Sequence, residues 1–223
     1  KLEYFDYEEE LTTILESNRK LWVKKATGLG ITEWTIRWIA WNCLKDDYWK
    51  ETQVDVTGVI ITGANQELTN KVIGRLKSLF RHEFKTKESV VILNGCRIEA
   101  FPTNHLSPAR GLNPKIVMLD EADFFPTRYQ DEARTVAERY IPKTNPHILL
   151  ISTPNLPGGL FERMEDEEDN GYVMKQMDYT IGLNKVFRPE DIATAKKSPS
   201  FEREYNLKYG FGSGDIFEGI ENI

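Results

Sequence analysis

A glycine loop between an apolar strand and a helix constrains the fold of this chain more than any other feature. Residues 20–32 read KLWVKKATGLGIT. A strand, a short glycine loop and a helix form the usual phosphate-binding loop, in which backbone N–H groups and the helix N-terminus surround a phosphate. Compared with the pattern G-x-x-x-x-G-K-[ST], Gly30 and Thr32 hold the last glycine and hydroxyl positions, but Ile31 stands where the lysine is expected.

Such a loop needs a cation, because charge builds up on a phosphoryl group during transfer. Lys25 is the closest candidate and stands where the first glycine of the pattern is expected, whereas Lys24 should point to the opposite strand face. An ordinary strand-to-helix turn also fits a degenerate glycine loop, so this interpretation requires a second motif. The residues expected around the nucleotide phosphates are Lys25, Ala26, Thr27, Gly28, Leu29, Gly30, Ile31 and Thr32.

The second motif is residues 115–123, KIVMLDEAD, an apolar strand that delivers two carboxylates at its end. This is the Walker B arrangement. We expect Asp120 to hold Mg²⁺ together with the Thr32 hydroxyl, and Glu121 to act as general base on the attacking water. Adjacent acids at the end of a buried strand are costly unless something uses them, so the pair supports an ATPase.

The remaining patterns alternate between strands and helices, which predicts an α/β fold with a mainly parallel sheet flanked by helices. Asn94-Gly95 predicts a hairpin turn. Trp34, Trp38 and Trp41 form a helical stripe that we assign to the core. Strands are expected over residues 54–64, within 88–101 and over 147–153, and helices over 4–17, 32–44, 65–80 and 127–140.

The strand over residues 147–153 ends in Ser152 and Thr153, ahead of Pro154. Small hydroxyls at a strand end beside the loop can sense the γ-phosphate and pass its loss to the next segment. A turn that only caps the strand fits these residues equally well. The sensing role therefore depends on the other motifs.

Composition limits what the chain can be. Its 223 residues allow one sizeable core with an appendage, and a net charge of -6 means that nucleic-acid contact must rest on a local patch. Cys43 and Cys96 lack the companions of a zinc site and are expected to be core thiols of a reducing compartment. We find no apolar run of membrane-spanning length and expect a soluble, intracellular protein without a membrane partner.

Four segments together resemble the ATPase domain of viral large terminase subunits, the motors of DNA packaging. These are KATGLGIT, the ARG that precedes VMLDEAD, ISTPN, and PGGLFERM. The resemblance implies a RecA-like P-loop NTPase core of the ASCE type, ATP and Mg²⁺ as cofactors, and double-stranded DNA as substrate. It also implies a homo-oligomeric ring, a pentamer on the portal, in which Arg110 completes the neighbouring subunit's site. Thr27 stands where the family often has an arginine, so that role is vacant or filled elsewhere.

The same resemblance implies the portal protein and the small terminase as partners. It places the chain in the cytoplasm of the infected host cell, transiently docked on the procapsid. We expect the core over residues 1–170 and a lid or linker over 171–223, leading to a nuclease domain absent from this chain. Two alternatives stay open. One is a DEAD-type helicase core, disfavoured because no second lobe fits, and the other is a hydrolysis-deficient structural protein.

Overall fold

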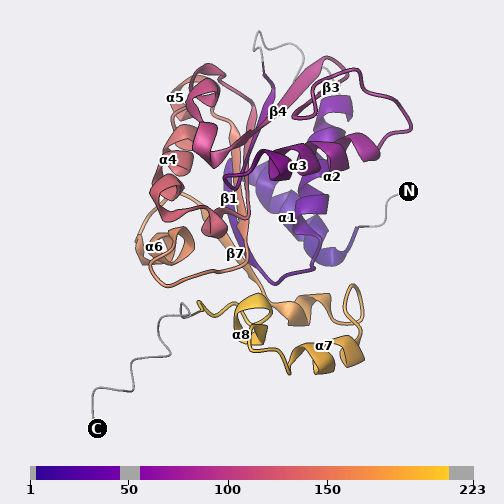
Figure 1. The fold of residues 1–223 in the computed structure, drawn as a ribbon, viewed down its shortest axis with the longest axis vertical. Helices are drawn as coiled ribbons and strands as arrows, with labels where there is room; N and C mark the ends of the chain where they lie inside the picture. Colours follow the sequence, from indigo (N-terminus) through magenta and orange to yellow (C-terminus); the bar gives the residue numbers. More distant parts are fainter. Residues whose placement is uncertain (1–3, 46–55, 211–223) are drawn as a thin grey trace.

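The computed structural model describes residues 4–45 and 56–210, in which a seven-stranded sheet lies between two layers of helices (Figure 1). The strands are β1 (Lys20–Lys25), β2 (Gly58–Thr62), β3 (Val90–Leu93), β4 (Cys96–Pro102), β5 (Ile116–Asp120), β6 (His147–Ser152) and β7 (Val173–Met177). The longer helices are α1 (Asp6–Ser17), α2 (Ile31–Lys45), α3 (Gln66–Ser78), α4 (Thr127–Glu138), α6 (Leu160–Asp166) and α7 (Pro189–Ala195).

The order of the strands is β3-β4-β2-β5-β6-β1-β7, and every neighbouring pair except β3-β4 is parallel. Each parallel connection crosses over through a helix or a longer segment, as parallel strands require. The antiparallel pair is the predicted hairpin. Asn94 and Gly95 at its turn both have positive φ, 50° and 83°, which is why this dipeptide favours a two-residue turn. The predicted α/β class is confirmed.

Helices α1, α2 and α3 cover one face of the sheet, and α4, α5 (Ile141–Thr144) and α6 cover the other (Figure 1). The central strands β2 and β6 are almost wholly apolar because both of their faces are buried. Cys43 and Cys96 lie buried in the core as thiols that form no disulfide within the described ranges. No helix within the described ranges is long and apolar enough to cross a membrane.

The tryptophan stripe of α2 is only partly in the core. Trp34 and Trp38 are buried, as predicted, but Trp41 is 58% exposed. The assignment of Trp41 to the core was wrong because a stripe at helical spacing fixes the direction of a face and not its width. The strand expected over residues 54–64 spans Gly58–Thr62, and residues 54 and 55 lie outside the described ranges.

The chain after β7 forms a small unit below the sheet, made of the 3₁₀ turn η4 (Tyr179–Gly182), α7 and α8 (Phe201–Glu204) (Figure 1). β7 itself pairs with β1, so the sheet extends past residue 170, where the sequence suggested that the core ends. The unit contacts the glycine loop through the backbone, since the Thr27 N–H donates to the Glu204 carbonyl at 2.8 Å. The segment around residues 214–217, expected to lead to a nuclease domain, lies outside the described ranges.

Candidate nucleotide-binding and catalytic site

The candidate site lies where β1, β6 and β5 end at the same edge of the sheet. Because these strands are parallel and β6 lies between the other two, the end of β6 adjoins the ends of both β1 and β5. This order brings Ser152 and Thr153 next to Glu121, and Thr153 next to Lys25. The predicted residues of three separate segments therefore meet at one place.

The loop between β1 and α2 has the backbone that glycine permits. Gly28 and Gly30 both have φ of 79°, a left-handed conformation that other residues adopt only with strain. A Cβ at Gly28 would also lie 3.1 Å from the Phe187 ring. The Tyr7 hydroxyl donates to the Leu29 carbonyl at 3.0 Å and holds the loop from the side of α1. These contacts give the loop a defined shape at the N-terminus of α2.

Lys25 lies in the centre of the site. Its ammonium donates to Glu121 Oε1 at 2.6 Å and to Thr153 Oγ1 at 3.3 Å, and the residue is only 6% exposed. Lys24 is equally buried but points the other way, as the strand period predicts, where it pairs with Glu165 and lies 4.8 Å from the centroid of the Tyr209 ring. Of the two lysines, Lys25 is the one placed to meet a phosphate held by the loop.

Glu121 is held in an unusual backbone conformation. Its φ of 55° and ψ of 48° place it in the left-handed region at the end of β5. Ser152 Oγ and the Thr153 N–H each donate to Glu121 Oε2 at 3.3 Å, while Lys25 holds the other carboxylate oxygen. The Glu121 side chain is still 42% exposed, so water can reach it. This combination suits a carboxylate that must orient and deprotonate a water molecule.

Asp120 pairs with the first turn of α2. Thr32 Oγ1 donates to Asp120 Oδ1 at 2.7 Å. Burial, followed by the charge of Glu121, raises the pKa of Asp120 to about 6, and the opposing effects of Thr32, Lys25 and Arg75 are smaller. Burial and a neighbouring acid make the ionised form of Asp120 unfavourable, so a bound cation would stabilise this carboxylate.

The pair of oxygen donors fits Mg²⁺, which is usually held by one or two protein oxygens together with nucleotide phosphates and water. No group of three or more His, Cys, Asp or Glu side chains in the described ranges could hold a metal ion by itself. Thr32 and Asp120 are therefore the residues that would bind the ion, with the nucleotide supplying further ligands.

Arg110 is not brought to this cluster. It lies in the 3₁₀ turn η2 (Ser107–Gly111), its side chain is 52% exposed, and it donates to Glu132 of α4 at 2.6 Å. In the described part of the chain, no hydrogen bond or ion pair joins it to Lys25 or Glu121. Arg110 is therefore an exposed arginine paired with α4 and lies outside the cluster around Lys25 and Glu121.

Asp123 is a structural member of the site that the sequence did not reveal. Its buried carboxylate accepts the backbone N–H of Asn155 at 2.7 Å and that of Phe161 at 2.9 Å. A Cβ on Gly159 would lie 2.7 Å from the same carboxylate, so the glycine makes this close approach possible. Asp123 thus ties the turn after β5 to the segment after β6. The only sequence signal was its place two residues after Glu121.

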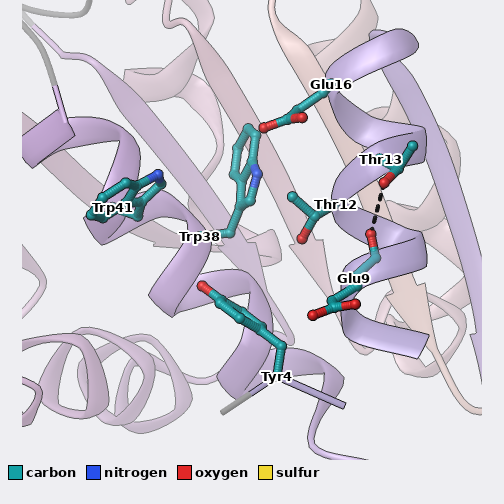
Figure 2. Close-up of a pocket in the computed structure, with 7 residues that line it drawn as sticks. All are labelled: Tyr4, Glu9, Thr12, Thr13, Glu16, Trp38 and Trp41. Atoms are coloured by element: carbon teal, nitrogen blue, oxygen red, sulfur yellow. Dashed lines mark hydrogen bonds between the residues drawn. The ribbon is translucent and has the colours of Figure 1, made fainter. Parts of the chain in front are cut away.

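A roomier cavity of about 620 Å³ lies between α1 and α2 and contains none of the predicted site residues. Figure 2 shows Trp38 and Trp41 of α2 facing α1 across this space. Its other lining residues are Tyr4, Glu9, Thr12, Thr13 and Glu16. Size alone therefore does not identify the chemical site, and we place it at the strand ends, where the cation, the two acids and the hydroxyls converge.

The mainly parallel sheet between two layers of helices, with a glycine loop and two acids at one edge, is a RecA-like P-loop fold, as predicted. No family model and no curated protein matches the sequence. Among solved structures, the chain has the fold of phage large terminase ATPase domains, which confirms the predicted resemblance at the level of the fold.

Three such structures show the extent of the likeness. A mutant ATPase domain of the Thermus phage P74-26 large terminase has a TM-score of 0.62 at 13% identity and covers 94% of this chain and 95% of its own. The HK97 bacteriophage large terminase has a TM-score of 0.68 at 14% identity, and the match covers 92% of this chain and 50% of the terminase. The large terminase of the thermophilic bacteriophage D6E, in complex with ATP-gamma-S, has a TM-score of 0.67 at 9% identity. The match covers 92% of this chain and 53% of that terminase. This chain thus spans about half the length of the latter two.

Proposed function

We propose that this chain is the ATP-hydrolysing motor domain of a large terminase, which translocates double-stranded viral DNA into a procapsid. The observation that carries the proposal is the contact of Lys25 with Glu121 at 2.6 Å, beside the contact of Thr32 with Asp120 at 2.7 Å. These contacts join a phosphate loop to a catalytic strand in a fold shared with large terminases, one of which was solved with ATP-gamma-S.

Each residue has a role in this mechanism. The loop amides and the Lys25 ammonium bind the β and γ phosphates, and Lys25 stabilises the charge that develops as the γ-phosphoryl group leaves. Thr32 and Asp120 would hold Mg²⁺, which would supply further neutralisation of the phosphate oxygens. When Lys25 turns to the phosphates, its hydrogen bond to Glu121 is replaced by one from the attacking water. Glu121 then takes a proton from this water as general base.

The hydroxyls at the end of β6 link this chemistry to motion. Ser152 and the Thr153 N–H donate to Glu121, so a change at the γ-phosphate reaches β6 through this carboxylate. Asp123 then connects the segment after β6 to the turn after β5. The unit of η4, α7 and α8 contacts the loop at Thr27 and acts as the lid that responds. This is how hydrolysis would move DNA relative to the subunit.

We assign Arg110 to the active site of the adjacent subunit in a ring of copies, docked on the portal together with the small terminase. Its exposure and its surface pairing with Glu132 support this role, because a surface ion pair costs little to exchange for a phosphate across an interface. An arginine supplied in trans accelerates hydrolysis by about a thousandfold or more. ATP turnover per subunit should therefore rise with protein concentration.

Mixing two inactive variants tests this proposal. Arg110→Ala and Glu121→Gln subunits should be inactive alone and recover partial ATP turnover together, because some interfaces then pair an intact arginine with an intact base. Arg97→Ala is the matched control, since Arg97 is also about half exposed and pairs with a carboxylate, Glu99. Arg97→Ala should be active by itself.

Three results would separate the alternatives. A mixture that stays inactive while the wild type assembles and turns over would place Arg110 in cis or make it a surface charge. ATP-dependent unwinding by a monomer would favour the helicase core. Binding of ATP without turnover by the wild type at any concentration would favour the hydrolysis-deficient protein.

A further inference from the structure

A second cavity opens beside the two catalytic acids. It has a volume of about 300 Å³, roughly that of ten water molecules in the liquid. Asp120 and Glu121 line one side and the end of β2 at Thr62 lines another. Lys71 and Arg75 of α3 supply its cations. The cavity therefore adjoins the proposed reaction centre on the side of α3, whereas Lys25 approaches Glu121 from β1.

Both cations of the cavity are held by weak surface pairs. Lys71 pairs with Glu67 at 2.7 Å, and both side chains are about two-thirds exposed. Arg75 pairs with Glu33 at 3.1 Å, with both side chains more than a third exposed. Exposed pairs of this kind contribute little, so either cation can exchange its carboxylate for a phosphate anion at small cost. Arg75 lines the same cavity as Asp120 and Glu121, so its guanidinium and the two acids face one space.

The mixture of charges selects one kind of phosphate. Lys71 and Arg75 can only donate hydrogen bonds, whereas ionised Glu121 can only accept them. Orthophosphate at neutral pH carries at least one O–H, so it can accept from the cations and donate to the carboxylate at the same time. A phosphodiester of DNA has no O–H to donate and would meet only repulsion from the acids. The cavity therefore favours free phosphate over the DNA backbone.

We propose that the cavity between α3 and the end of β5 is a binding site for the orthophosphate released on ATP hydrolysis, held by Arg75 and Lys71 with Glu121 as acceptor. The product then leaves toward α3, away from the loop that holds ADP. This inference rests on the proposed ATPase activity for its biological meaning. The affinity for phosphate itself can be measured without any turnover.

The protein is first saturated with Mg²⁺ and ADP, so that the loop is filled. It is then titrated with inorganic phosphate, and binding is followed by the broadening of the phosphate ³¹P line. Wild-type protein should bind phosphate saturably. Sulfate, which carries no proton at neutral pH, should bind more weakly, as measured by how poorly it displaces phosphate and restores the narrow ³¹P line. Arg75→Ala should weaken phosphate binding by at least about fivefold, because a charge-assisted hydrogen bond is lost. Lys71→Ala, one turn away on α3, is a second variant with the same expected direction. Arg97→Ala is the matched control and should bind as the wild type does.

The preference for phosphate over sulfate tests the acceptor. It should narrow in Glu121→Gln, because an amide replaces one carboxylate oxygen with a donor. If Arg75 only supported the fold and did not bind the anion, Glu121→Gln would leave the preference for phosphate over sulfate unchanged. Equal binding of sulfate and phosphate by the wild type would overturn the assignment of Glu121.

Other outcomes are equally decisive. Absence of saturable phosphate binding, or the same affinity in Arg75→Ala as in the wild type, would overturn the inference. An unchanged phosphate affinity together with weaker binding of double-stranded DNA by Arg75→Ala would assign the cations to the DNA backbone instead. A wild-type protein that hydrolyses no ATP but shows the predicted phosphate binding would refute the proposed function and leave this site standing.

Discussion

Lys24 and Lys25 form a matched pair of buried lysines whose replacement separates activity from stability. They are neighbours in β1, 5% and 6% exposed, and each bonds a carboxylate, but on opposite faces of the sheet. We consider Lys24→Met and Lys25→Met, because methionine keeps most of the apolar stem and removes only the charge. Equal burial and identical chemistry make each variant the control for the other.

The structure gives the two losses different sizes. Lys25 is the only one of the two beside Glu121, so Lys25→Met should reduce kcat by about a thousandfold, or about 4 kcal/mol of transition-state stabilisation. Its cost in stability should be below about 1 kcal/mol, because Glu121 is 42% exposed and can be hydrated. Lys24→Met should do the reverse. It leaves Glu165, only 26% exposed, without its cation, which costs about 1 to 3 kcal/mol.

Two measurements are needed on each variant. Initial rates of phosphate production from ATP give kcat and KM, and urea unfolding gives the free energy of unfolding. Lys24→Met should retain kcat within about threefold at a temperature where it is folded. Near-wild-type turnover in Lys25→Met, or losses of activity that follow losses of stability in both variants, would refute the assigned role of Lys25.

Three further predictions concern the acids and the partly buried histidine His147. Glu121→Gln should keep nucleotide affinity and lose turnover, whereas Asp120→Asn should weaken the Mg²⁺-dependent part of binding; equal losses of affinity would contradict this division. Asp123→Asn should lower the free energy of unfolding by about 1 to 3 kcal/mol, because an amide NH₂ would face a backbone N–H, and an unchanged urea midpoint would argue against that hydrogen bond. Burial, followed by the charge of Arg19, lowers the pKa of His147 from 6.5 to about 4, so the unfolded chain binds the proton first and stability should fall as the pH drops from 6.5 toward 4. When the pH drops from 7 to 5, the free energy of unfolding should fall by about 1 to 2 kcal/mol less in His147→Gln than in the wild type, as measured by urea unfolding. The same pH profile in both proteins would exclude His147 as the cause.

The sequence predicted the meeting of site residues correctly where these residues stand at the ends of recognisable strands. The glycine loop, Asp120 and Glu121 all follow strand patterns, and parallel strands end at a common edge, so their meeting could be predicted. The opposite directions of Lys24 and Lys25 follow from the strand period alone. The roles assigned to these residues stay predictions.

Other features depend on tertiary contacts that no local pattern encodes. The insertion of β6 between β1 and β5 comes from the crossovers of the sheet, and it determines that Ser152 touches Glu121. Arg75 lines the same cavity as the two acids because α3 packs beside the start of α2, where Arg75 pairs with Glu33. Asp123 resembled a surface acid in sequence, whereas its carboxylate is buried on two backbone N–H groups.

The left-handed backbone of Glu121 implies a trade-off between stability and activity. A non-glycine residue in this region costs on the order of 1 kcal/mol, and glycine or asparagine tolerates it better. Glu121→Gly should therefore make the turn after β5 easier to form while removing the proposed base. The same change would leave Lys25, which is only 6% exposed, without its carboxylate, and that loss opposes the relief of backbone strain. The glutamate at this position therefore joins a backbone cost to a charge that the neighbouring lysine requires.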